Sequence, residues 1–494
     1  MYKFLRKNSH VIVWIVVVAF LVGGVLFGYG SYVTNRRGNS APAQQTQKDI
    51  AKVNGEEIDA GEYWAKIQAS ASYLSQIPGN QQLMYRYRIL SSIIDNTLLS
   101  QKADEMNIKV KVTDEDVQAE VDKVLERNKM TEEELEEYFK NNNRSLKQWK
   151  ETVRDGLKEQ KRIKAVIDSV AEDVTVSEEE IAEEYEKVRV SRIVMPKNVD
   201  VEDPKAKITE AKSRIDEGTD FAQVAKDYSK SYDAASGGDL GFIGHDGTNL
   251  GKALAEKAFA MKKGEVSDVI ETETGYTIIK VTDKKTTDDK EFAEKKKEIK
   301  KELLDSKKLK AQNEWFEKIK EESEIIIAYP HLAGYEALTS QNYEKAINKF
   351  EEVIQNNENS PYYSYLARAY KESGNVDKAI ETLKKAVEIH PEDWQTQLSL
   401  ADTYKGEGMT EKAIEAYKQV SEKAKENRWI HTRLHQVFKE LGEEELAQKE
   451  ADISMELIQK AQEEAKKNAE KVKQEEEAKK QAEQEQKTDE KDSE

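Results

Sequence analysis

The middle of the chain shows two kinds of apolar periodicity, one typical of strands and one typical of helices. Residues 188–195 alternate apolar and polar positions and are rich in β-branched side chains, which predicts a strand. Residues 203–216 and 221–228 carry apolar positions at helical spacing. Residues 276–281 predict a closing strand. The predicted order is strand, two helices, a glycine-rich turn, a short helix and two strands, which is an α/β arrangement.

Four short motifs occur in order within this stretch. They are Asp-Phe-Ala at 220–222 with Tyr-Ser at 228–229, Gly-Gly-Asp-Leu-Gly at 237–241, Gly-Glu-Val-Ser at 264–267, and Gly-Tyr-Thr-Ile-Ile-Lys at 275–280. The paired glycines indicate a tight turn that approaches another part of the backbone closely. Together the motifs resemble the parvulin class of peptidyl-prolyl cis-trans isomerases. The resemblance implies a parvulin domain over residues 188–283 and an enzyme that acts on X–Pro bonds.

The residues at the expected catalytic centre depart from the parvulin pattern. Rotation about an amide bond has a barrier of about 18–20 kcal/mol, so uncatalysed X–Pro isomerisation takes about 10–100 s. The resemblance implies a site with two histidines, a Cys or Asp, and an apolar pocket. By the motifs, the histidine positions fall at Arg192 and Thr277, and the Cys or Asp position falls at Ser231. We therefore expect catalytic positions Arg192, Ser231 and Thr277 to form a degenerate centre with weak or lost activity.

The proline pocket keeps its apolar character. By the same resemblance, the substrate-binding positions are Ile243, Leu250, Leu254 and Phe259. A small insertion at 245–249 lies inside this set. An apolar pocket beside an altered polar centre predicts a surface that still binds proline-containing polypeptides.

Helix signals flank the parvulin-like stretch on both sides. Residues 50–58 predict two strands joined by an Asn-Gly turn, and residues 325–327 predict a third strand beside them. Helix-capping residues precede acidic first turns at Thr113, Thr131 and Ser177, and Ser145 followed by Leu-Lys-Gln repeats the capping pattern. Residues 1–327 resemble the bacterial extracytoplasmic folding factors of the SurA, PpiD and PrsA group. That resemblance implies a helical chaperone domain with the isomerase inserted; an unrelated helical bundle is the alternative.

The last third of the chain repeats a short pattern at a fixed interval. Alanines at 346, 379, 413 and 447 follow one another at steps of 33, 34 and 34 residues. This is the tetratricopeptide period, which predicts an all-α solenoid of paired helices. Such arrays present a concave groove, so we expect a protein partner there. A spacer or a dimerisation surface remains the alternative.

The amino terminus predicts a membrane anchor. Residues 11–33 are apolar or small almost throughout, and about 20 apolar residues suffice to span a bilayer. The run is longer than the usual core of a cleaved signal peptide, which is the alternative. We expect a single-pass protein of the cell membrane with most of the chain outside the cytoplasm.

Composition narrows the choice of partners. The net charge of −18 argues against nucleic acid, because few basic patches would neutralise phosphates. The chain has no cysteine, which excludes disulfides and thiolate metal sites. His431 and His435 have the spacing of a metal pair on one helix face, but no third ligand is evident. We expect no metal and no cofactor.

These predictions combine into a multidomain α+β protein. The expected segments are a cytoplasmic terminus at 1–10, a transmembrane signal anchor at 11–33, a linker at 34–49, a helical chaperone domain at 50–187 plus 284–327, a parvulin-like domain at 188–283, tetratricopeptide repeats at 328–458, and a charged disordered tail at 459–494. The expected function is a membrane-anchored folding factor for unfolded exported polypeptides. The alternative is a noncatalytic holdase or assembly scaffold.

Overall fold

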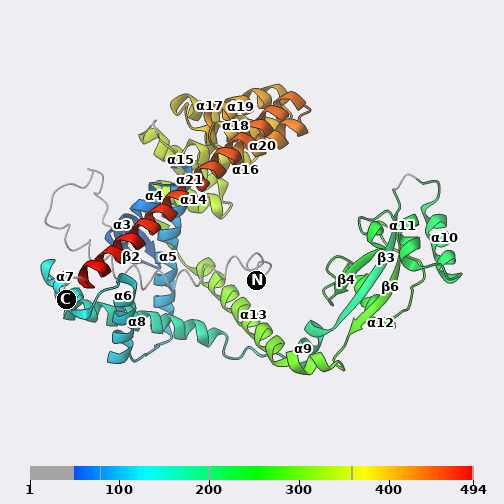
Figure 1. The fold of residues 1–494 in the computed structure, drawn as a ribbon, viewed down its shortest axis with the longest axis horizontal. Coiled ribbons are helices and arrows are strands. Elements are labelled where there is room, and N and C mark those ends of the chain that lie inside the picture. The colour runs from blue at the N-terminus through cyan, green and yellow to red at the C-terminus, as the bar shows by residue number, and fades with distance from the viewer. Residues whose placement is uncertain (1–48, 78, 199–200, 358–359, 492–494) are drawn as a thin grey trace. The chain divides into compact units, whose positions relative to one another are not determined.

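The computed structural model describes residues 49–77, 79–198, 201–357 and 360–491. They form two compact units (Figure 1). The sheet unit is residues 164–322, and the helical unit is the described part of residues up to 163 and from 323 onward. The predicted anchor at 11–33 lies outside the described residues. Within the described ranges, no helix has an apolar stretch long enough to cross a membrane.

A four-stranded antiparallel sheet forms the centre of the sheet unit. The strand order is β4-β3-β6-β5. The strands are β3 (Lys187–Pro196), β4 (Asp239–Ile243), β5 (Ile270–Glu271) and β6 (Gly275–Lys285). The helices are α10 (Pro204–Asp216), α11 (Phe221–Tyr228) and α12 (Lys252–Ala260). The predicted strands and helices are confirmed, and the sequence pattern missed only the short strand β4.

The two faces of this sheet have separate apolar cores. Val190 and Ile279 pack with α12 on one face. Ile193 and Ile278 pack with α10 and α11 on the other face. Because side chains alternate along a strand, Arg192 on β3 and Thr277 on β6 belong to the α12 face. Two of the predicted catalytic positions therefore share one face of the sheet.

Helices from both sides of the sheet domain belong to the same unit. They are the end of α8 (Leu146–Val170), α9 (Glu178–Tyr185) and α13 (Lys290–Glu322). Lys307 on α13 forms an ion pair of 2.7 Å with Glu180 on α9. The rings of Phe292 and Tyr185 lie 5.0 Å apart. Residues 164–187 and 284–322 fall in the same compact unit as the sheet, whereas they were predicted to belong to the helical domain.

A small antiparallel sheet begins the helical unit. Strands β1 (Asp49–Val53), β2 (Glu56–Asp59) and β7 (Ile325–Ile327) have the order β2-β1-β7. Asn54 and Gly55 have φ values of 50° and 85°, as a tight hairpin turn requires. The pairing of β7 with β1 confirms that the chain returns to its first strand after the inserted unit.

Five helices of the described chain lie between strand β2 and α8. They are α3 (Ala60–Ala69), α4 (Ala71–Leu74), α5 (Gly79–Glu105), α6 (Asp114–Asn128) and α7 (Glu132–Asn141). The helix α8 follows them and continues into the sheet unit. Capping boxes at Thr113 and Thr131 are present as predicted. The first helical segment is interrupted between α3 and α4 at Ser70, whose hydroxyl donates to the carbonyl of Lys66 at 3.0 Å.

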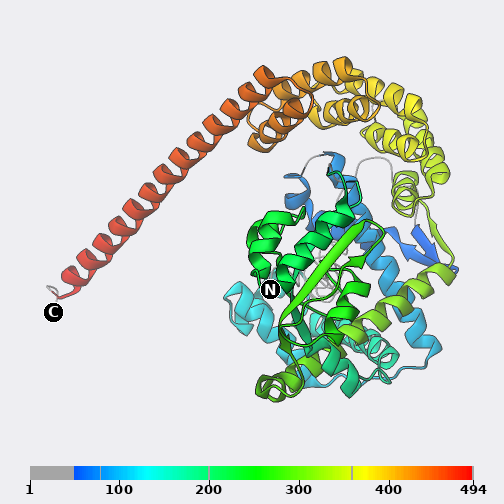
Figure 2. The ribbon, with the colours of Figure 1, turned by 90° about the vertical axis from the view of Figure 1, so that its right-hand side faces the viewer.

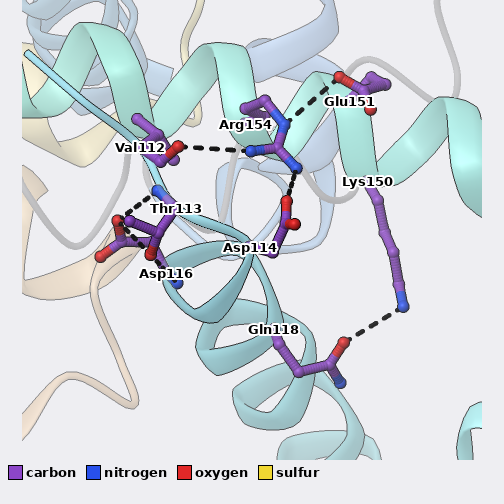
Figure 3. A network of polar contacts seen from close by, with 8 residues as sticks. All are labelled: Val112, Thr113, Asp114, Asp116, Gln118, Lys150, Glu151 and Arg154. Atoms are coloured by element: carbon purple, nitrogen blue, oxygen red, sulfur yellow. Dashed lines mark hydrogen bonds and ion pairs between the residues drawn. The ribbon is translucent and has the colours of Figure 1, made fainter.

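Polar contacts hold α6 against α8 (Figure 3). Arg154 on α8 lies 2.6 Å from the Asp114 carboxylate and donates to the carbonyl of Val112 at 3.4 Å. Lys150 donates to Gln118 at 3.3 Å. Beneath these contacts, the buried valines of α6 pack against Trp149, Val153 and Leu157. The two helices therefore form one packed layer.

Paired helices form the carboxy-terminal part of the helical unit (Figure 2). Their bounds are α14 (Pro330–Thr339), α15 (Tyr343–Asn356), α16 (Tyr363–Glu372), α17 (Val376–Ile389), α18 (Trp394–Gly406), α19 (Thr410–Lys423), α20 (Arg428–Glu440) and α21 (Glu444–Lys491). The repeat alanines Ala346, Ala379, Ala413 and Ala447 are buried, as the predicted register requires.

The last helix differs from its prediction. Beyond residue 459 a fraying helix running into a disordered tail was expected, and α21 continues to Lys491. The physical reason is composition, since Ala, Glu, Lys and Gln are strong helix formers. The same residues that predict a solvated segment also favour a solvated helix.

Candidate active site

A buried ion pair occupies the polar centre of the sheet unit. Arg192 extends from β3, and its Nε donates to Oδ2 of Asp233 at 2.8 Å. Its second terminal nitrogen lies 2.8 Å from the same oxygen. The side chain of Arg192 is 15% exposed and that of Asp233 is 3% exposed. A charge in this environment needs a partner of opposite charge, and Asp233 supplies it.

Ser231 joins the ion pair through the other oxygen of Asp233. Its hydroxyl donates a short hydrogen bond to Oδ1 of Asp233. The same hydroxyl lies 3.0 Å from Oγ of Ser229. Ser229 in turn accepts a hydrogen bond of 3.0 Å from the backbone of Val194 on β3. The chain of contacts begins and ends on β3, so it fixes the loop after α11 against that strand.

The paired glycines explain why this loop meets β3. Gly238 has a φ of 78° and its N–H donates to the carbonyl of Asp233 at 2.9 Å. The carbonyl of Gly238 accepts from the N–H of Arg192 at 2.9 Å. A Cβ atom at Gly238 would lie 2.0 Å from the carbonyl oxygen of Arg192. Only glycine permits this approach, which brings Asp233 to the guanidinium.

Thr277 shares the sheet face of Arg192 from the neighbouring strand. It lies on β6 opposite Val194 of β3, and 4% of it is exposed. Arg192 and Ser231 are joined through Asp233, which accepts hydrogen bonds from both. Thr277 is brought to the same face without belonging to that chain of contacts.

The four predicted pocket residues come together in one cluster on the α12 face. Ile243 and Leu250 are 3% and 6% exposed, so they form part of the core. Leu254 and Phe259 are only partly buried and pack against that core. The surface available to a proline ring is therefore smaller than four open apolar residues would provide.

The insertion at 245–249 is tied to both halves of the site. The ring of His245 stacks on Phe259 at 3.6 Å between centroids. The carbonyl of Asn249 accepts a hydrogen bond of 3.2 Å from Arg192. The insertion covers Phe259 and holds one end of the guanidinium.

Sequence reasoning missed Asp233 and Tyr232. Tyr232 is 80% exposed, and the guanidinium carbon of Arg192 lies 5.5 Å from its ring centroid. A signal for Asp233 was present, because an arginine on the inner face of a sheet requires a nearby acid. Asp233 follows the expected position Ser231 by two residues. The polar centre is a linked Arg–Asp–Ser arrangement.

This arrangement limits the chemistry of the site. The guanidinium is always charged, so it donates hydrogen bonds and does not accept them. The hydroxyl of Ser231 donates a hydrogen bond to Asp233, so its oxygen can only accept a further hydrogen bond. Fixed donors beside an apolar surface can bind a peptide carbonyl and a proline ring. Proton transfer is not required for rotation about an amide bond, so this donor set suits isomerisation without a nucleophile.

The histidine pair considered as a metal site has other contacts. Nδ1 of His431 lies 2.6 Å from Oε2 of Glu450, and both residues are buried. Nδ1 of His435 lies 2.8 Å from the carbonyl oxygen of Ala447. Both partners belong to α21. In the part of the chain that the structure describes, no three His, Asp or Glu side chains gather closely enough to hold a metal ion.

The sequence matches known families over four stretches. Residues 1–163 match the SurA-like N-terminal domain. Residues 189–283 match the PPIC-type peptidyl-prolyl isomerase domain. Residues 337–402 and 395–424 match tetratricopeptide repeats. The parvulin-like boundaries predicted from the motifs differ from the matched isomerase stretch by one residue at its start.

Several curated proteins are similar to this chain over up to 58% of its length. The foldase protein PrsA of Clostridium botulinum strain Loch Maree is 30% identical over 305 residues, which cover 58% of this chain and 90% of that protein. PrsA of Geobacillus kaustophilus is 35% identical over 218 residues, covering 43% and 66%. The crystal structure of PrsA from Bacillus cereus is 24% identical and covers 57% of this chain and 95% of its own, with a TM-score of 0.28.

Proposed function

The chain belongs to the PrsA family of foldases, and from this premise we propose that it is a membrane-anchored folding factor whose isomerase centre works slowly. It carries the peptidyl-prolyl isomerase domain of the parvulin class. Its substrates are unfolded polypeptides that contain proline. The observation that carries the proposal is the ion pair of Arg192 and Asp233 beside the apolar residues of the α12 face.

The proposed catalysis rests on binding and on one donor. Leu254 and Phe259 hold the proline ring, and a free N–H of Arg192 donates to the carbonyl of the rotating bond. Binding that is equal in the ground state and the transition state leaves kcat unchanged. Arg192 accelerates rotation only as far as its bond strengthens when the amide twists. Slow turnover follows, because Arg192 and Thr277 occupy the two positions at which the parvulin pattern has histidines.

A noncatalytic holdase is the second candidate. The burial of Ile243 and Leu250 favours it, because little apolar surface remains for a proline ring. In both versions the helical unit binds unfolded chains, and the repeats bind a protein partner through their groove. The two versions differ only in whether the sheet unit changes the rate of proline isomerisation.

Binding of unfolded chains is tested by aggregation of a chemically denatured model protein on dilution. We expect the full chain to suppress light scattering without ATP, in proportion to its concentration. Arg192→Lys should suppress scattering as well as the unsubstituted chain, because the binding surface lies outside the isomerase centre. Scattering that the full chain leaves unchanged would contradict a role in folding.

Location is a separate part of the proposal. The apolar run at 11–33 supports a single anchor with the folded units outside the cytoplasm. Protease added to intact spheroplasts should then digest both folded units while the anchor stays with the membrane. Full protection of both units, or their release as a soluble form, would refute the anchored arrangement.

A further inference from the structure

A cavity in the helical unit has a lining that no step of the proposed isomerase function uses. It has a volume of about 320 Å³ and lies among β2, α3, α5, α6 and α8. Its apolar wall consists of Ile93 on α5 and of Val153, Leu157 and Ile163 on α8. Gly156 lines it without a side chain. The volume is within the range of small-ligand pockets, which is about 300–1,000 Å³.

Acidic side chains from four elements line the same cavity. They are Glu56 of β2, Glu62 of α3, Glu120 of α6 and Glu159 of α8. No lysine, arginine or histidine is among the residues that line this cavity in the described chain. The cavity therefore combines an apolar wall with charged lining residues that are all acidic.

Three oxygens in this lining are buried and have no hydrogen-bond partner. They belong to Asn96, Glu120 and Glu159. The other carboxylate oxygen of Glu120 pairs with Lys123 at 2.5 Å, and that of Glu159 pairs with Arg162 at 2.8 Å. Each glutamate thus has one oxygen paired within the chain and one left over. A buried acceptor without a partner is destabilising because it has lost its hydrogen bonds to water, so these three acceptors favour a donor from outside.

We propose that this cavity binds a lysine or arginine side chain of an unfolded client polypeptide. The alkyl stem of such a side chain packs on apolar surface while its charged end donates several hydrogen bonds. The apolar wall and the three free acceptors match the two ends of that side chain. A divalent cation fits less well, because the described acidic groups do not converge closely enough to hold one.

The walls of the cavity are held in place by the contacts between α6 and α8. Arg154 binds Asp114 at 2.6 Å and Lys161 binds Asp116 at 2.6 Å, each joining α8 to the start of α6. Arg162 on α8 pairs with Asp104 on α5. These ion pairs connect all three helices that carry the free acceptors. The site is therefore formed before a client arrives, which lowers the entropic cost of binding.

This inference rests on the proposed folding function and names the client chemistry that its helical unit prefers. The test uses the full chain and two fluorescent twelve-residue peptides of Gly, Ser and Leu with three lysines. In the second peptide each lysine is acetylated, which keeps the stem and removes the charge. Fluorescence anisotropy at about 0.15 M salt limits long-range attraction by the acidic protein. We expect the lysine peptide to bind about tenfold more tightly or better, as charged hydrogen bonds imply.

The decisive variant is Glu120→Gln with Glu159→Gln, which keeps the shape of both side chains. It should bind the two peptides equally. The matched control is Glu126→Gln with Glu137→Gln, two exposed positions on α6 and α7 that remove the same net charge. The control should keep the tenfold preference. A thermal melt checks folding, and Glu159→Gln alone replaces the double variant if that variant is unfolded.

Equal binding of both peptides by the unsubstituted chain would overturn the proposal, and so would a preference that survives in the decisive variant. Suppression of aggregation without any preference for lysine would refute this inference alone. A preference for lysine without suppression of aggregation would leave this site standing and refute the folding function.

Discussion

At the scale of single residues, the parvulin motifs predicted where the site residues lie better than they predicted which side chains those residues bind. The motifs placed Arg192 and Ser231 correctly near each other, and the structure joins them through Asp233. The side chain of Asp233 was missed because a motif records residue types at fixed offsets and not the charges that a substituted neighbour requires. Once arginine replaces histidine on an inner sheet face, a buried acid becomes necessary. That dependence follows from electrostatics, and matching residue types to a motif does not record it.

The glycine at 238 gives a direct test of how the loop is positioned. Gly238→Ala should lower the free energy of unfolding of the sheet unit by more than about 2 kcal/mol, because strain at positive φ adds to a clash with the Arg192 carbonyl. Gly241→Ala is the matched control, since Gly241 also has a positive φ of 73° but no atom near its missing Cβ. Denaturant unfolding measures both. Equal losses would show that the loop does not depend on this close approach.

At the scale of elements, local signals predicted helix starts well and helix ends less well. The capping boxes at Thr113, Thr131 and Ser177 are all present. Such caps depend on residues within one turn, so sequence alone suffices to find them. The break at Ser70 and the continuation of α21 to Lys491 depend on competition between similar local energies. A pattern of apolar positions does not decide that competition.

The first repeat helix makes an element-scale contact that responds to pH. His331 at the start of α14 stacks on Tyr362 of the next repeat, with ring centroids 5.4 Å apart. Burial, with a smaller contribution from the nearby charge of Arg86, lowers the pKa of His331 from 6.5 to about 4. The folded state therefore keeps this imidazole neutral in a range where the unfolded chain protonates it. Stability from this group is complete above pH 6.5 and falls as the pH drops towards 4.

We expect protonation of His331 in the unfolded chain to lower the free energy of unfolding of the helical unit by up to about 1.4 kcal/mol for each pH unit between pH 6.5 and 4. His331→Phe should keep the stacked ring and remove that part of the pH dependence. Denaturant midpoints at several pH values measure the difference between the two proteins. His245→Phe in the sheet unit is the control and should leave the helical unit unchanged. Identical pH profiles for His331→Phe and the unsubstituted chain would contradict the assignment.

At the scale of the whole molecule, repeats and motifs predicted the sequence of domains but not the unit to which the helices flanking the isomerase domain belong. The strand β7 pairs with β1 as expected, so the isomerase domain is an insertion. The helices that lead into and out of it, α9 and α13, contact each other and fold with the sheet. Which neighbour a connecting helix packs against is set by tertiary contacts of long sequence separation. Those contacts leave no periodic signal in the chain.

The central claim is that the Arg192–Asp233 pair supports slow proline isomerisation, and the rate of cis-to-trans conversion in X–Pro peptides tests it most directly. The full chain should accelerate conversion measurably, yet roughly 100-fold less than an ordinary parvulin, as loss of a positioned polar group implies. Arg192→Lys and Leu254→Ala should reduce this acceleration further, while Arg189→Ala, on the same strand but paired with Asp239, should not. Activity equal to that of an ordinary parvulin and insensitive to Arg192 and Leu254 would contradict the account.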